Sequence, residues 1–104
     1  MEIQKKKTAT YDLTKLVKVV KKKRIKAFTS SSMTTISLLT LSVNGAVEII
    51  GTLTPNEFYK TMPSNTHPGY FQDVYRVPYG DIELYVKFTD YSSGPVVLSF
   101  KLWT

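Results

Sequence analysis

Strict alternation of apolar and polar side chains over residues 82–88 constrains the fold of this chain more than any other feature. Every second residue is apolar, and most of the residues between are polar; the apolar ones are Ile82, Leu84, Val86 and Phe88. Successive side chains of a β-strand point to opposite faces, so this segment predicts a strand with one apolar and one polar face. The apolar face must be buried against a second layer of structure.

The preceding segment, residues 70–77, predicts the other strand of a hairpin around the turn at residues 78–80. Burial brings the apolar sets of both strands to one face of the sheet, so the polar sets also share a face. A longer turn pairs Gln72 with Tyr85, and a shorter one pairs Gln72 with Lys87. Either register gathers four polar side chains on one face: Gln72, Arg76, Tyr85 and Lys87.

Helices are predicted in front of this hairpin. Residues 12–22 carry apolar side chains at the i, i+3, i+4 and i+7 positions of one helical face. A Ser/Thr-rich segment predicts a short helix over residues 31–41. The sequence TPNE at residues 54–57 combines an N-cap, a proline at the first helical position and a capping-box glutamate, so a third short helix is predicted to begin there. Pro63 ends this helix, which places Lys60 at its C-terminal end.

Two more strands complete the predicted sheet. The turn signal Asn44-Gly45 precedes a run rich in Val and Ile, which predicts a strand over residues 46–53. The last strand is predicted over residues 95–102, where apolar side chains again share one parity. Helices packed on a mainly antiparallel sheet define a single α+β domain over residues 1–104, in which residues 1–11 form a flexible basic N-terminus.

The charge of the chain is distributed unevenly. The net charge at pH 7 is +6, and residues 1–26 hold ten cations and two acids, or +8, which leaves −2 for the rest. Only four cations remain after residue 26: Lys60, Arg76, Lys87 and Lys101. The basic N-terminal run can be a solvated helix face or a polyanion-binding face, and a membrane-surface role for residues 12–26 is a third possibility. The three of these that fall within residues 58–87 are stronger indicators of a site than any lysine of the N-terminal run.

Composition narrows the cellular setting and the chemistry. The chain has no cysteine, no run of roughly eighteen apolar residues and no apolar region behind its basic N-terminus. We therefore expect a cytoplasmic protein that does not enter a membrane. It also lacks a glycine-rich phosphate loop and Cys/His metal spacing, so we expect no metal and no cofactor.

The polar face of the hairpin combines cationic, amide and phenol side chains, and this combination suits a phosphodiester. Lys60 and Arg76 can neutralise charge on the phosphoryl oxygens, while Gln72 donates a hydrogen bond to phosphate or ribose. RNA supplies its own nucleophile, the 2′-hydroxyl, so the protein must provide only positioning, charge stabilisation and proton transfer. Tyr85 is the candidate for proton transfer, because nearby cations such as Lys87 are expected to lower the pKa of its phenol.

Three motifs at fixed separation resemble one known family. They are FYKTM at residues 58–62, QDVYR at residues 72–76, and the strand that carries Tyr85 and Lys87. In these motifs the chain resembles the MqsR (motility quorum-sensing regulator) family of bacterial toxins. The resemblance implies a RelE/ParE-like α+β fold and ribosome-independent cleavage of single-stranded mRNA at short GC-containing sites. It also implies a cognate antitoxin, a zinc-binding protein with a helix-turn-helix domain, that silences the toxin.

The resemblance and the chemistry together give a set of candidate site residues. Three fall on the active-site positions of the family and are predicted to be catalytic: Lys60, Gln72 and Tyr85. Four are predicted to contact the substrate: Met62, Arg76, Lys87 and His67. His67 is the only histidine in the chain and lies in the polar loop before the hairpin.

Ordinary structural roles are open for the same residues. Tyr85 can be a half-buried strand tyrosine, and Gln72 can be a surface amide. Arg76 can pair with Asp81 or Glu83 across the hairpin. The alternative function is a non-catalytic module with the same fold that binds RNA or the antitoxin.

Overall fold

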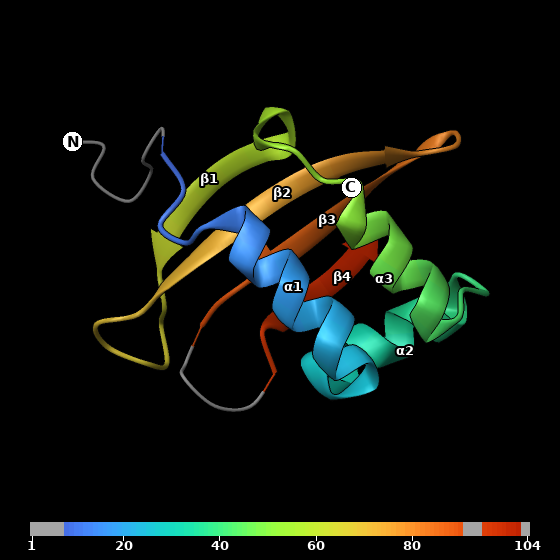
Figure 1. The fold of residues 1–104 in the computed structure, drawn as a ribbon, viewed down its shortest axis with the longest axis horizontal. Coiled ribbons are helices and arrows are strands. Elements are labelled where there is room, and N and C mark those ends of the chain that lie inside the picture. The colour runs from blue at the N-terminus through green and yellow to red at the C-terminus, as the bar shows by residue number, and fades with distance from the viewer. Residues whose placement is uncertain (1–7, 91–94, 103–104) are drawn as a thin grey trace.

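The computed structural model describes residues 8–90 and 95–102, in which three helices pack on a four-stranded antiparallel sheet (Figure 1). The helices come first in the chain and are α1 (Leu13–Lys23), α2 (Ser30–Leu38) and α3 (Val43–Gly51). The strands pair in chain order and are β1 (Phe58–Pro63), β2 (Phe71–Tyr79), β3 (Ile82–Phe88) and β4 (Val97–Leu102). Two 3-10 segments, η1 (Arg24–Ala27) and η2 (Pro55–Glu57), follow α1 and precede β1. The predicted α+β class is confirmed.

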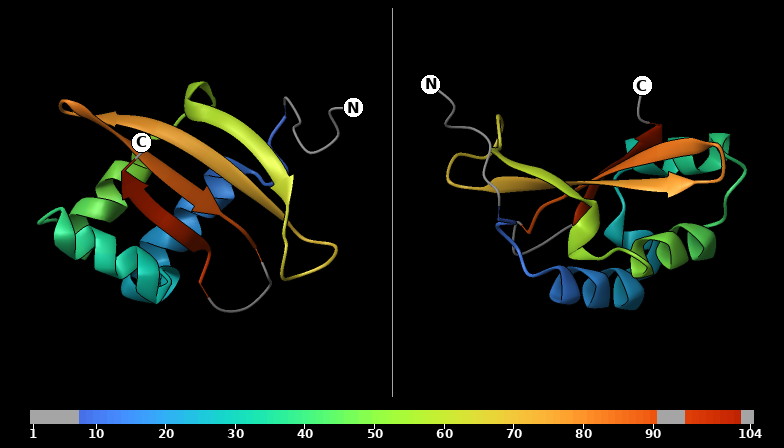
Figure 2. Two further views of the ribbon diagram at one scale, coloured as in Figure 1. Left: turned by 180° about the vertical axis from the view of Figure 1, so that it is seen from behind. Right: turned by 90° about the horizontal axis from the view of Figure 1, so that it is seen from above.

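The helices leave one face of the sheet open. Helices α1 and α3 lie on the same side of the sheet (Figure 2). The core between the layers joins α1 and α3 to apolar strand residues of one parity, among them Val77, Leu84, Val86 and Phe100. Strand residues of the other parity therefore point away from these helices, and we call that side the open face.

The first two helices are confirmed, and each begins at a capping side chain, Asp12 for α1 and Thr29 for α2. The carboxylate of Asp12 accepts a hydrogen bond from the Thr14 backbone N–H at 2.9 Å, which begins α1. The backbone N–H of Thr29 donates to the Val97 carbonyl at 3.1 Å, which places the start of α2 beside β4. This contact covers part of the β4 edge, a strand edge that is otherwise open to pairing.

The predicted strand over residues 46–53 is wrong, because this segment forms α3. Val43, Ala46, Val47 and Ile50 are spaced i, i+3, i+4 and i+7, so they form one helical face that the Val/Ile content of the run obscured. The Ser42 hydroxyl accepts a hydrogen bond from the Gly45 N–H at 3.0 Å, so the Asn44-Gly45 turn signal lies inside a capped first turn. Within the described residues no single helix is long and apolar enough to cross a membrane; α2 and α3 meet that criterion only as a pair bent by 99°.

The predicted third helix is also wrong beyond its first turn. The capping box forms, since the Thr54 N–H donates to the Glu57 carboxylate at 2.6 Å, but the helical segment is only η2. The residues that follow, FYKTM, include aromatic and β-branched side chains that favour a strand. They form the edge strand β1, which gains backbone hydrogen bonds to β2, so Lys60 lies within a strand rather than at a helix end.

The hairpin of β2 and β3 is confirmed, but neither predicted register is correct. The chain turns at Gly80-Asp81, where Gly80 has a φ of 62° that glycine adopts without strain. Val74 pairs with Lys87 and Arg76 pairs with Tyr85, so Gln72 lies further along the strand than either prediction placed it. The side-chain period of a strand is two, and the shift is an even number of residues, so the predicted sharing of a face survives.

The predicted flexible N-terminus, residues 1–11, lies outside the described residues as far as residue 7, whereas Thr10 and Tyr11 are tied to the sheet through the aspartate of QDVYR. Asp73 is fully buried, and its carboxylate accepts hydrogen bonds from the Thr10 N–H at 3.1 Å and the Tyr11 N–H at 2.8 Å. The Thr10 hydroxyl also lies 2.7 Å from that of Thr61, which is paired with Asp73. This cluster holds residues 10–11 against β1 and β2.

Candidate active site

The open face carries every cation of the chain beyond residue 26. These cations come from four different strands: Lys60 from β1, Arg76 from β2, Lys87 from β3 and Lys101 from β4. Strand register accounts for the gathering. Val74 pairs with Lys60 on one side and Lys87 on the other, whereas Arg76, Tyr85 and Lys101 form a second row across three strands.

Val74 is the centre of this arrangement. It is fully buried although it lies on the open face and outside the core between the layers. The backbone positions of Lys60 and Lys87 lie on the neighbouring strands, roughly 5 Å from that of Val74. Those of Gln72 and Arg76 lie two residues away along β2, at roughly 7 Å. Long side chains rooted at these positions can reach the same space above Val74.

Tyr59 belongs to the same face and was not predicted. The pairing of β1 with β2 is irregular between Phe58 and Lys60, and such a bulge re-aims a side chain that strict alternation would send to the other face. The Lys60 Nζ atom lies 5.5 Å and the Arg76 Cζ atom 5.4 Å from the centre of the Tyr59 ring. The bulge is set by pairing across strands, so FYKTM alone gave no signal for it.

A second tyrosine ring is flanked by the other two cations. The Lys87 Nζ atom lies 5.9 Å and the Lys101 Nζ atom 5.3 Å from the centre of the Tyr85 ring. Lys101 was not predicted as a site residue, although its position between Phe100 and Leu102 in an alternating strand did place it on the polar face. Each of two rings is thus bordered by two cations, at separations that favour cation–π attraction.

The predicted lowering of the Tyr85 pKa is wrong. Partial burial of the phenol, followed by the electrostatic effect of the Tyr59 phenol, raises the pKa of Tyr85 above its ordinary value. Desolvation disfavours the phenolate, and the nearby lysines do not overcome this. Tyr85 therefore keeps its proton at neutral pH and suits hydrogen-bond donation or acid catalysis rather than the role of a resting base.

Arg76 forms the ion pair that was one of its two predicted alternatives. Its guanidinium donates to the Glu83 carboxylate at 2.5 Å, and the two side chains are 34% and 38% exposed. Such a pair is accessible to solvent and adds little to stability. The pair holds the guanidinium beside the Tyr59 ring.

The remaining candidates lie at the other end of the face. Gln72 pairs with Met62, and both side chains are half-buried. His67 is exposed in the loop between β1 and β2, where its Nδ1 atom lies 2.9 Å from the Thr66 hydroxyl and its ring centre 6.4 Å from that of Tyr70. A substrate contact by His67 stays a prediction. In the described parts of the chain, no three His, Cys, Asp or Glu side chains gather as a metal site would require.

Comparison with known families gives the class of this protein. Residues 8–102 match the model of a toxin family, and this span is nearly the whole chain. The chain belongs to that family, the motility quorum-sensing regulator, toxin of MqsA. No protein in a search of curated sequences matches the chain. Membership confirms the resemblance seen in the three motifs, and it identifies the protein as the toxin of a toxin–antitoxin system, with an antitoxin as its partner.

Proposed function

We propose that this toxin is a metal-independent endoribonuclease that cleaves single-stranded mRNA by attack of a ribose 2′-hydroxyl on the adjacent phosphate. The observation that carries the proposal is the gathering of four cations around two tyrosine rings on one open sheet face. Cations bind the phosphates of a single strand, and exposed aromatic rings stack its bases. The short GC-containing sites of the family are part of the proposal.

The scissile phosphate is proposed to lie above Val74. Lys60 and Lys87 flank that position and compensate the charge that builds on the non-bridging oxygens in the transition state. Arg76 adds planar donors from the next row. Gln72 lies on the opposite side along β2, so its amide donates to the ribose or to the neighbouring phosphate.

Tyr85 is proposed to act as the general acid. As the 2′-oxygen bonds to phosphorus, the bond from phosphorus to the 5′-oxygen breaks, and the Tyr85 hydroxyl gives its proton to that departing oxygen. The 2′-hydroxyl gives its proton to solvent. A phenol holds its proton at neutral pH even at its ordinary pKa, and the raised pKa makes Tyr85 a weaker acid, so the support for this role is the position of its ring between Lys87 and Lys101. The products are a 2′,3′-cyclic phosphate and a 5′-hydroxyl end.

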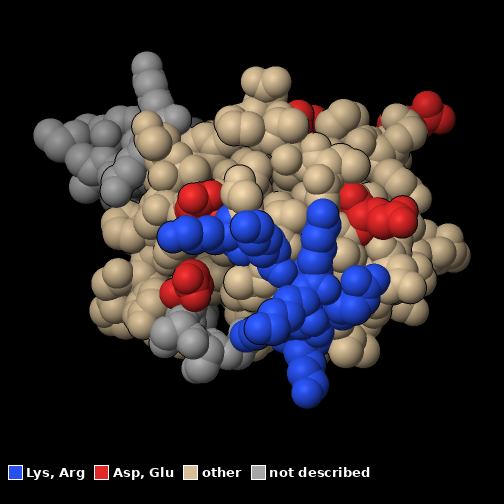
Figure 3. All heavy atoms as spheres, in the orientation of Figure 1, with Lys and Arg blue, Asp and Glu red and all other residues tan. Residues whose placement is uncertain are grey.

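The cations of α1 and η1 lie on the other side of the molecule from the proposed site. They are spread over the helical layer that faces the viewer in Figure 3, whereas the open face is turned away. A substrate of a few nucleotides on the open face does not reach them. If the basic helix is the polyanion-binding face that its sequence permits, it attracts, in our proposal, only long RNA.

Labelled mRNA incubated with the protein and a metal chelator tests the proposal. We expect cleavage with 2′,3′-cyclic phosphate ends, and a loss of roughly 10²- to 10⁴-fold in rate for Tyr85→Phe, the range for removal of a general acid. Tyr79→Phe is the matched control, because Tyr79 is exposed and lies on the opposite parity of the strand pair. Intact RNA at high protein concentration would leave only a binding module.

A further inference from the structure

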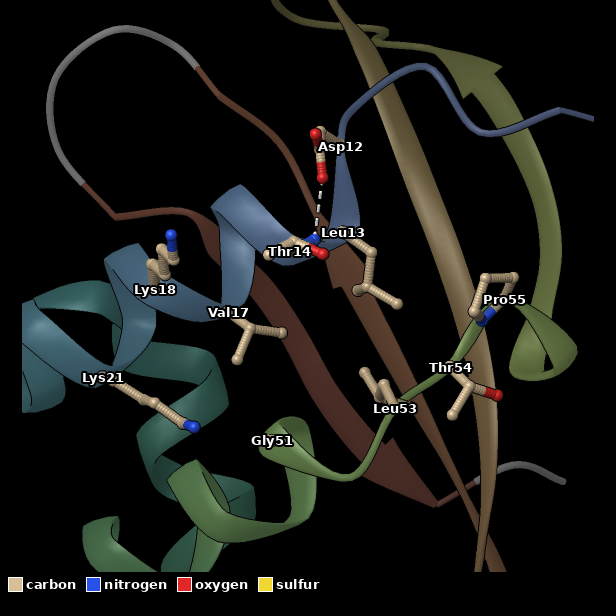
Figure 4. A pocket seen from close by; sticks show the side chains of 10 residues that line it. All are labelled: Asp12, Leu13, Thr14, Val17, Lys18, Lys21, Gly51, Leu53, Thr54 and Pro55. Atoms are coloured by element: carbon tan, nitrogen blue, oxygen red, sulfur yellow. Dashed lines mark hydrogen bonds between the residues drawn. The ribbon is translucent and has the colours of Figure 1, made fainter.

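A groove on the helical layer lies far from the proposed nuclease site. It has a volume of about 480 Å³ and runs between α1, the end of α3 and the segment that leads to η2. Four apolar side chains form its floor, and we define the α1 groove as Leu13, Val17, Leu53 and Pro55 with Lys18 and Lys21 at its rim. The lining also includes Asp12, whose carboxylate accepts hydrogen bonds from the Thr14 and Lys15 N–H groups at the start of α1. Leu13, Val17 and Leu53 point toward one another, and Lys21 reaches toward Gly51 (Figure 4).

The rim of the groove opens onto the most basic surface of the protein. Residues 13–26 contain seven cations and no acid, and Figure 3 shows these cations gathered over α1 and η1. Neither Lys18 nor Lys21 forms an ion pair within residues 8–90 and 95–102. Both ammonium groups are exposed beside an apolar hollow, so they are available to carboxylates from another molecule.

We propose that the α1 groove docks the antitoxin through an acidic segment that inserts an apolar side chain. This inference rests on membership of a toxin–antitoxin family and not on the nuclease chemistry. Carboxylates of the segment meet Lys18 and Lys21, while its apolar side chain covers the floor. A nucleic acid backbone uses the lysines but gains nothing from the apolar floor, so the combination favours a protein.

Gly51 offers a way to close the groove without changing its charge. A Cβ atom added there would lie 3.4 Å from the Cε atom of Lys21, which is ordinary contact with the end of a flexible side chain. Gly51→Phe therefore places its ring in the groove and occupies the space proposed for the partner. The pair Lys18→Glu and Lys21→Glu reverses the rim charge at two exposed positions.

Calorimetric titration of the full chain with the purified antitoxin tests the proposal. We expect Gly51→Phe and the Lys18→Glu/Lys21→Glu pair each to raise the Kd by roughly tenfold or more. The matched control is Lys22→Glu/Lys26→Glu, which makes the same change in charge on the same basic surface outside the groove. It should raise the Kd by less than about threefold. Thermal melting establishes that each variant is folded.

Three results would overturn the proposal. The first is an unchanged Kd for folded Gly51→Phe. The second is an equal rise for the two charge-reversed pairs, which indicates general attraction without a defined site. The third is that Gly51→Phe weakens binding of a non-cleavable deoxy oligonucleotide while leaving the antitoxin Kd unchanged, so that the groove belongs to nucleic acid. If the wild-type protein cleaves no RNA, the nuclease proposal fails, yet the titration still decides this one.

Discussion

The protein has two cationic surfaces, and they differ in what surrounds the charges. On α1 and η1 the seven lysine and arginine side chains are exposed and follow one another along the chain. On the open face four cations from four strands lie 5.3 to 5.9 Å from tyrosine ring centres, and three of them are half-buried. The helical surface carries more cations, but the cations on the sheet are the ones held at fixed positions beside aromatic rings. Our proposal therefore places the chemistry where cations lie among rings and amides, and not where cations are most numerous.

Among the variants that compare the two surfaces, removal of one cation from the open face should have the largest effect. We expect Lys60→Met to lower kcat/KM for a short RNA by roughly 10²- to 10³-fold, because a fixed charge that stabilises the transition state is lost. Initial rates on an oligonucleotide of defined sequence measure this. A change of less than about threefold would remove Lys60 from the proposed mechanism.

The buried carboxylate that supports the sheet gives the next largest effect, on stability. Asp73→Asn should destabilise the protein by about 2 to 3 kcal/mol, because the new amide group faces backbone N–H donors of Thr10 and Tyr11 that the carboxylate now satisfies. Urea unfolding measures the loss. Asp81→Asn in the exposed turn is the control and should stay within about 0.5 kcal/mol. Equal stabilities for the two variants would show that the N-terminal segment contributes nothing to the sheet.

Tyr75 on the core face provides a contrast with Tyr85 on the open face. Burial, with the charges of Asp73 and Asp12, raises the pKa of Tyr75 to about 12. The unfolded chain releases this proton near pH 10, so between pH 10 and 12 the native state holds more protons and stability falls as pH rises. The loss attributable to Tyr75 is about 2 to 3 kcal/mol by pH 12. Tyr75→Phe should remove that part of the pH dependence in urea unfolding series, whereas an unchanged slope would contradict the raised pKa.

Much of the fold followed from periodicity, and the errors came from segments with two competing signals. The alternation of residues 82–88 and the helical spacing of residues 12–22 are each long enough to identify an element. Residues 46–53 have strand composition but helical spacing, and spacing prevailed because it buries one face against the core. At residues 54–62 a capping box forms, but it is followed by only a single helical turn. The residues after that turn pair with β2 and therefore form a strand.

The sequence predicts which side chains of the candidate site share a face of the sheet, but it does not predict the distances and contacts between them. Parity alone brought Gln72, Arg76, Tyr85 and Lys87 to one side, and this holds for any even shift of register. The register depends on where the turn closes, which is at Gly80-Asp81. Several consecutive residues there favour a turn, so the sequence alone does not select this position. The bulge at Tyr59 and the raised pKa of Tyr85 depend on contacts between strands and on burial, and neither is written in local sequence.

The smallest effects should come from the helical surface. Lys15→Met combined with Lys22→Met should change cleavage of a short RNA by less than about twofold, because both side chains are exposed and α1 lies on the side of the sheet opposite the open face (Figure 2). If long RNA contacts this surface, the slope of log K against log salt should shrink by about 0.7 for each lysine removed. Binding of a long non-cleavable strand at several salt concentrations measures the slope. A loss of short-RNA cleavage as large as that of Lys60→Met would mean that the two surfaces work as one site, which contradicts the separation that the strand register establishes.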